Sequence, residues 1–247
     1  MLAHRYKVWA WGTESSAGSD QVIKWSAGIT CLAKRHRDSP YEVFNELVCM
    51  QLGRALGLPI PVGFVIEKGS DLFYCSANLA LFDGEAPDAD FEAFAENDPQ
   101  MALGVVVFDA WVANADRHSR NAIYDDIDDR IYLFDHGMAL LGNRGIPYLQ
   151  ESAQELRLCE DLTREIRDAS SFSHWYNRLV NIPDFMITDA VREAGKTGIA
   201  EEEQLETANF LMRRRNQLWK LLKDNQETQF PKLNTGELLF SPFEDPR

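Results

Sequence analysis

The sequence is poor in positive charge. Its 247 residues contain 25 Lys and Arg against 39 Asp and Glu, which gives a formal net charge of −14 at pH 7. Surfaces that bind nucleic acid need clustered Lys and Arg side chains to contact phosphates, so the composition argues against a nucleic-acid partner. A chain this acidic that binds a phosphate-bearing ligand needs cations concentrated at the site, or Mg²⁺.

Cysteines and long apolar runs are also scarce. The four cysteines show no CxxC spacing and no Cys/His cluster with zinc-ligand spacing, so we expect no structural metal site. Free, isolated cysteines suit a reducing compartment. No apolar run reaches the roughly 18–20 residues of a membrane span, and the N-terminus has no apolar segment typical of a signal peptide. We therefore expect a cytoplasmic protein with no membrane partner.

The residues that are present suit a globular α+β protein. Hydrophobic residues make up 45% of the chain, enough for the core of one large domain or of two small lobes. We expect a β-rich unit with one helix over residues 1–80, a mainly helical unit over 81–230 and a tail over 231–247. Residues 76–84 are expected to cross from the first unit to the second.

Apolar periodicity predicts the individual elements. In the first unit we expect strands at 5–11 and 20–26 around a Gly/Ser loop at 12–19, a polar loop at 27–40, a helix at 41–57, and strands at 62–67 and 71–76. In the second unit we expect helices at 99–113, 151–169, 173–181, 184–195 and 201–224. The three arginines at 213–215 are expected to lie on a solvated face of the last helix.

Residues 108–137 carry the most informative polar side chains. Asp116 and Asn121 lie in a turn after the apolar helix, and Asp135 ends the second of two short strands. Two acids and a neutral oxygen ligand in this order suit the binding of Mg²⁺ against phosphate groups, because Mg²⁺ prefers one or two carboxylates together with substrate oxygens. Phosphoryl transfer needs little more than this and a base beside the acceptor hydroxyl, a role that suits Asp116.

Candidate partners for such a site lie upstream. Lys24 is in the second expected strand, one strand after the Gly/Ser loop that contains Ser15 and Ser16. Small residues allow backbone N–H groups of such a loop to approach phosphate oxygens, although a plain hairpin turn fits equally. Glu46 lies beside the apolar stripe of its helix, where it could reach a strand lysine. Each of these residues alone would be read as a surface residue. The basic run at 34–37 is expected to be a solvated loop.

Four separated motifs then give a resemblance to a known family. Residues 114–121 read NADRHSRN, close to the pattern N-x-D-R-H-x-x-N, and residues 132–137 read YLFDHG. The upstream motifs are Asn45-Glu46 followed by LGLPIP at 56–61, and VIKW at 22–25. In this order the chain resembles the HipA-like kinases, which share the fold of protein kinases and phosphatidylinositol kinases. The resemblance implies a bilobal protein-kinase-like fold, with a small antiparallel β-rich lobe and a mainly helical one.

The resemblance also implies roles. Lys24 would contact the phosphates of ATP, with the loop at Ser15 and Ser16 beside them, and Glu46 would orient Lys24. Asp116 would be the catalytic acid–base residue, while Asn121 and Asp135 would hold Mg²⁺. Arg117 and His118 would brace the catalytic loop. The implied activity is transfer of the γ-phosphate, with a protein Ser or Thr as acceptor. A small-molecule or lipid kinase of the same fold, and a nucleotide-binding module with weak or no catalysis, remain as alternatives.

Some features depart from the family pattern. His136 follows Asp135 where related kinases often have Phe, so gating by an aromatic side chain is not expected. The chain is shorter than the full-length HipA toxins and looks like the branch with a kinase domain alone. It carries no helix-turn-helix signature. The resemblance leaves open which molecule accepts the phosphate and whether the protein is a toxin with an antitoxin partner.

Overall fold

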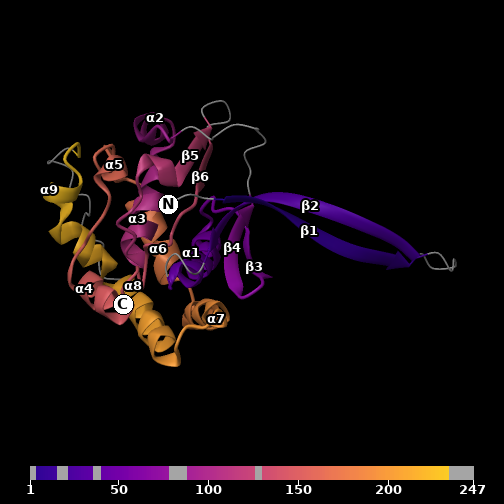
Figure 1. The fold of residues 1–247 in the computed structure, drawn as a ribbon. Coiled ribbons are helices and arrows are strands. Elements are labelled where there is room, and N and C mark those ends of the chain that lie inside the picture. Colours follow the sequence, from indigo (N-terminus) through magenta and orange to yellow (C-terminus); the bar gives the residue numbers. More distant parts are fainter. Residues whose placement is uncertain (1–3, 16–21, 36–39, 78–87, 126–129, 234–247) are drawn as a thin grey trace.

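The computed structural model describes residues 4–15, 22–35, 40–77, 88–125 and 130–233. It is a mixed α/β structure with two small antiparallel sheets and a mostly helical body (Figure 1). Much of the expected crossover at 76–84 and the tail from 234 lie outside the described residues. The division of the chain near residue 80 therefore stays a prediction.

The larger sheet has the strand order β1-β2-β4-β3 and is antiparallel throughout. Its strands are β1 (His4–Ser15), β2 (Val22–Arg35), β3 (Gly63–Lys68) and β4 (Asp71–Ala77). Only the last five residues of β2, from Cys31 to Arg35, pair with β4. The remainder of β2 pairs with β1 alone, so these two strands extend from the molecule as a ribbon (Figure 1).

The expected loop at 27–40 is wrong over residues 27–35, because β2 continues to Arg35. Within this segment Gly28 lies opposite Trp9 of β1, and the strand pairing continues without a break on either side of it. Backbone hydrogen bonds to β1 and then to β4 hold this segment extended, including the small residues Ala27 and Gly28. The strand β1 likewise runs past the expected end at residue 11 and reaches Ser15.

Helix α1 (Glu42–Leu56) joins the sheet to the helical body. It contacts β2, β3 and β4 and also α6 and α7. The expected helix at 41–57 is confirmed, and it ends at Gly57, whose φ of 84° is readily adopted only by glycine. Its buried residues include Phe44, Val48 and Leu52, which belong to the main hydrophobic core. The helix thereby fixes the sheet against the body.

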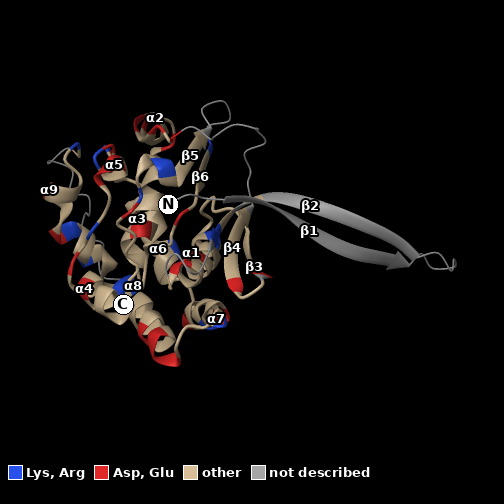
Figure 2. Ribbon diagram, in the orientation of Figure 1, with Lys and Arg blue, Asp and Glu red and all other residues tan. Residues whose placement is uncertain are grey.

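The body is built around α3 (Pro99–Val112), which is buried along almost its whole length. The other helices are α2 (Phe91–Asn97), α4 (Ile146–Gln154), α5 (Glu160–Thr163), α6 (Phe172–Val180), α7 (Asp184–Gly195), α8 (Glu201–Asp224) and α9 (Gln226–Gln229). Acidic residues occupy the first turn of α8 (Figure 2), where they face the positive end of the helix dipole. No helix in the described ranges is long and apolar enough to cross a membrane.

Two sequence expectations for the body are wrong. The single helix expected at 151–169 is two helices, α4 and α5, separated by an extended segment whose Leu156 is buried. The arginines at 213–215 do not share a solvated face. Arg214 and Arg215 are buried, and the Arg214 guanidinium donates hydrogen bonds to the carbonyl oxygens of Ala110, Ser152 and Glu155. Burial lowers the pKa of Arg214 to about 10.

Candidate active site

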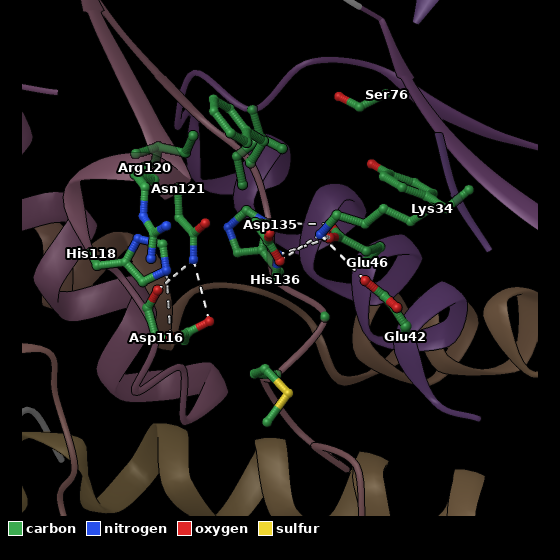
Figure 3. Close-up of a pocket in the computed structure, with 16 residues that line it drawn as sticks. Lys34, Glu42, Glu46, Ser76, Asp116, His118, Arg120, Asn121, Asp135 and His136 are labelled. Carbon is green, nitrogen blue, oxygen red and sulfur yellow. Dashed lines mark hydrogen bonds and ion pairs between the residues drawn. The ribbon is translucent and has the colours of Figure 1, made fainter. Parts of the chain in front are cut away.

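A pocket of about 350 Å³ lies beside α1 and the chain segments that follow α3 and the second small sheet. That sheet is the hairpin of β5 (Ala122–Asp125) and β6 (Arg130–Leu133). The charged and polar residues lining the pocket are Lys34, Glu42, Glu46, Tyr74, Ser76, Asp116, His118, Arg120, Asn121, Asp135 and His136 (Figure 3). Segments far apart in the sequence therefore contribute to one cavity.

The loop after α3 is held by hydrogen bonds to the helix itself. The helix ends at Ala113, which has a left-handed conformation with φ of 54°. The side chain of Asn114 donates to the Asp109 carboxylate at 2.9 Å and accepts from the Asp116 N–H at 3.2 Å. These contacts turn the chain sharply and place Asp116 at the pocket.

Arg117 connects this loop to the segment that ends in Asp135. Its buried guanidinium forms an ion pair with Asp109 at 3.0 Å. It also donates hydrogen bonds to the carbonyl oxygens of Asn121 at 2.6 Å and Phe134 at 2.7 Å. A guanidinium is planar and has several fixed donors, so it can hold two chain segments together in this way. These contacts agree with the bracing role that the sequence analysis gave to Arg117.

Asp116 and Asn121 lie side by side. The Asn121 amide nitrogen donates to the Asp116 backbone oxygen at 2.6 Å and to its carboxylate at 3.3 Å. A short 3₁₀ turn, Ser119–Asn121, sets the spacing between them. The Asn121 side chain lines the pocket, and these bonds engage its amide nitrogen and not its amide oxygen. His118 lies 3.8 Å from the Asp116 carboxylate.

Asp135 has a φ of 61°, a left-handed conformation that residues with a side chain adopt rarely, although Asp and Asn adopt it more often than most. The surrounding contacts hold it there. The buried Asn45 side chain donates to the Gly137 carbonyl at 2.7 Å and accepts from the Leu141 N–H at 3.4 Å. The next residue of α1, Glu46, accepts a hydrogen bond from the His136 N–H at 2.9 Å. The Asn-Glu pair of α1 therefore positions the segment that carries Asp135.

Lys34, and not Lys24, is the lysine beside Glu46. Its ammonium lies 2.5 Å from both the Glu46 and the Asp135 carboxylates. Lys24 lies ten residues earlier in β2, opposite Thr13. Ten residues of strand span roughly 33 Å, which is far beyond the reach of a lysine side chain. The pairing of Lys24 with Glu46 expected from the sequence is therefore incorrect in this structure.

The sequence interpretation missed Lys34 because it treated residues 27–40 as a loop. An indication was present in the strand alternation. Cys31 and Ala33 are buried together with Phe73 and Cys75 in a small cluster of their own, so Lys34 points to the opposite face of the sheet. That face is the one that meets α1 and the pocket.

The charges at this end of the pocket are strongly coupled. Burial acts to lower the pKa of Lys34, but Glu46, Asp135 and Glu42 outweigh it and raise the pKa above its usual range. Burial acts to raise the pKa of Glu46, but Lys34 and the hydrogen bond from His136 bring it below its usual range. Burial and the nearby Arg117 lower the pKa of His136. The ammonium and the Glu46 carboxylate are therefore charged at neutral pH, while the His136 imidazole is neutral.

The two serines expected beside the phosphates are not part of the described pocket. Ser15 is the last residue of β1, opposite Val22, and Ser16 lies outside the described residues. From β4, Tyr74 and Ser76 contribute to the pocket wall instead.

Comparison with known proteins assigns the family. Residues 24–181, more than half of the chain, match the sequence profile of the HipA-like kinases. The chain belongs to the HipA-like kinase family. The matched range includes β2 from Lys24 onward, α1 and every pocket residue named above. No match was found among curated proteins.

Two solved structures are similar to this HipA-like kinase to different degrees. A structure titled as the Helicobacter pylori proinflammatory kinase CtkA has a TM-score of 0.53 at 13% identity, covering 83% of this chain and 90% of that one. A HipA from Shewanella oneidensis MR-1, solved with HipB and its operator DNA, has a TM-score of 0.41 at 14% identity. That match covers 91% of this chain and 66% of HipA. At these identities the first likeness shows the fold alone.

Proposed function

We propose that this HipA-like kinase transfers the γ-phosphate of ATP to a protein Ser or Thr in a reaction that requires Mg²⁺. The observation that carries the proposal is the convergence of Lys34, Glu46, Asp116, Asn121 and Asp135 on one pocket. A lysine paired with a helix glutamate, a loop aspartate and a second aspartate are the parts that phosphoryl transfer uses in kinases. The acceptor class rests on the family to which the chain belongs.

The donor set at the metal position fits Mg²⁺. Asn121 and Asp135 offer an amide oxygen and a carboxylate, which are hard oxygen ligands. Among the described residues no three His, Cys, Asp or Glu side chains converge to hold a metal by themselves. A cation here would complete its shell with phosphate oxygens and water, as Mg²⁺ commonly does. When bound, it would neutralise charge on the phosphates during transfer.

The protein residues then have distinct tasks. Asp116 would accept the hydrogen bond of the acceptor hydroxyl and take its proton as the oxygen attacks the γ-phosphorus. The bond from that phosphorus to the bridging oxygen breaks, and ADP leaves. Lys34 would bind phosphate oxygens, held in place by Glu46. Lys34 contacts Asp135 directly in the structure, so the carboxylate that would hold the metal ion also helps to position the ammonium.

The test is transfer from γ-labelled ATP with Mg²⁺, comparing the parent protein with Asp116→Ala and Asp135→Asn. We expect labelled protein with the parent chain and a loss of label of at least a hundredfold with either variant. Asp189→Asn, which removes an exposed carboxylate on α7, is the matched control and should retain full activity. ATP binding without transfer by the parent chain would favour a nucleotide-binding module. No binding of ATP would contradict both functions.

A further inference from the structure

Strand β1 lies at one edge of the larger sheet. Its neighbour there is β2, and no strand within the residues that the structure describes borders its other side. In an antiparallel sheet, alternate residues of an edge strand keep their backbone N–H and C=O groups on the open side. Over the twelve residues of β1, this side offers a long row of hydrogen-bonding groups to another strand.

The ribbon of β1 and β2 projects from the body (Figure 1). A two-stranded ribbon alone is marginally stable in water, and it normally needs a third strand or a packed layer. Open edges in soluble proteins are usually interrupted by proline, by charged residues or by a bulge. Residues 8–13 of β1, VWAWGT, contain no proline and no charged residue, and their pairing with β2 has no bulge. This edge therefore favours the addition of another strand.

The sequence of β1 matches itself when two copies run antiparallel. The residues around Ala10 are nearly symmetric, so a pairing centred there puts Trp9 of each copy opposite Trp11 of the other. Opposite aromatic residues on neighbouring strands favour antiparallel pairing, and this arrangement contains two such pairs. The symmetry indicates a second copy of this chain, because the strand of an unrelated protein would not require it.

The charged residues of β1 also suit an antiparallel pair. The basic Arg5 and Lys7 precede Ala10, and the acidic Glu14 follows it. An antiparallel pair therefore brings the basic half of one strand beside the half of the other that carries Glu14. An in-register parallel pair would instead put Lys7 opposite Lys7, which is unfavourable.

The acidic bodies of the two copies would lie far apart in this arrangement. The ribbon projects from the body, so antiparallel pairing places the bodies at opposite ends of the joined strands (Figure 1). Twelve residues of strand span about 40 Å, several times the Debye length at physiological salt. The repulsion between two chains that each carry a net charge of −14 is therefore largely screened.

We infer that this protein forms a dimer in which the β1 strands of two copies pair antiparallel about Ala10. The pairing joins the two larger sheets into one continuous sheet. The residues that line the pocket belong to other segments, so the inference stands apart from the proposed function.

The first experiment is sedimentation equilibrium of the parent protein and two variants in which both tryptophans of β1 are replaced. Trp9→Lys with Trp11→Lys puts lysine opposite lysine at both pairs, whereas Trp9→Lys with Trp11→Glu puts lysine opposite glutamate. We expect a dimeric parent, and a dissociation constant about tenfold or more larger for the first variant than for the second. Equal constants would overturn the inference. A monomeric parent would also overturn it, and would leave the β1 edge to a strand of a different protein.

Oxidative cross-linking tests the register. Ala10→Cys places a thiol at the two-fold axis, where the Cα atoms of opposite residues are about 4.5–5.5 Å apart and a disulfide can form. Val8→Cys is the matched control, because the same residue of the other copy would lie four residues along the strand, about 13 Å away. The parent protein reports cross-linking through its four native cysteines. We expect a linked dimer above the parent level with Ala10→Cys alone. Equal cross-linking of the two variants, or none with Ala10→Cys, would contradict the pairing.

Discussion

Replacement of Lys34 by Met should destabilise the fold as well as abolish transfer. The variant removes the ammonium that lies between Glu46 and Asp135, with Glu42 3.6 Å away. Both glutamate side chains are 2% exposed, so two buried carboxylates lose their cation. Removing one partner of a buried ion pair costs about 3–5 kcal/mol. For a chain of this size we expect Tm to fall by roughly 6–20 °C.

The pH dependence gives this prediction a specific signature. In the parent protein the pKa of Glu46 is depressed, so its stabilising contribution is present above its unfolded pKa and is lost as the pH falls through the folded pKa. In Lys34→Met burial dominates and raises the Glu46 pKa above the unfolded value. The free-energy cost of burying the ionised Glu46 carboxylate is then present at neutral pH, and it falls as the pH is lowered and Glu46 becomes protonated. The difference in unfolding free energy between the two proteins should therefore shrink from pH 7.5 to pH 5.

The assay is urea denaturation of both proteins across this pH range, with Lys24→Met as the matched control. Lys24 lies in the part of β2 that pairs only with β1, so its replacement should leave both Tm and transfer activity close to those of the parent. A stable and active Lys34→Met protein, together with an inactive Lys24→Met protein, would refute the assignment of Lys34.

Two further predictions concern residues that position the site and the core. Arg214→Ala leaves the carbonyl oxygens of Ala110, Ser152 and Glu155 without their donor. In urea denaturation this replacement should reduce the unfolding free energy by about 3 kcal/mol. The control Arg213→Ala, on the exposed face, should change it by less than about 0.5 kcal/mol. Equal effects of the two replacements would contradict the burial of Arg214. Asn45→Ala removes the hydrogen bonds to Gly137 and Leu141, and should lower the unfolding free energy by about 2 kcal/mol. It should also lower kcat by a larger factor than it changes the KM for ATP, whereas replacement of the exposed Asn177 by Ala should have neither effect. An unchanged kcat would count against a positioning role for Asn45.

The parts of the site that could be predicted from the sequence are those whose structure is determined by residues near them in the chain. Asp116, Asn121 and Asp135 lie within one stretch of twenty residues, and the helix, turn and strands between them carry their own sequence signals. The structure brings all three to one pocket. Helix α1, with Gly57 at its end, was likewise predictable because its apolar spacing and its terminating residue agree.

The features that the sequence did not predict depend on contacts between distant segments. The length of β2, and with it the position of Lys34, is set by pairing with β1 and β4, and Gly28 with its small neighbours interrupts the strand signal of the sequence. The burial of Arg214 arises where α8 crosses the ends of α3 and α4, which supply the carbonyl oxygens it binds. A run of three arginines does not reveal which of them turns inward.

The central claim is that Lys34 is the lysine beside the phosphates of a bound nucleotide. An acyl-phosphate derivative of ATP transfers its acyl group to a lysine amine next to the phosphates, and mass spectrometry of the digested protein identifies the labelled residue. We predict labelling of Lys34 that excess ATP with Mg²⁺ prevents, with no protectable label on Lys24. Protectable labelling of Lys24, with Lys34 unmodified, would contradict the account.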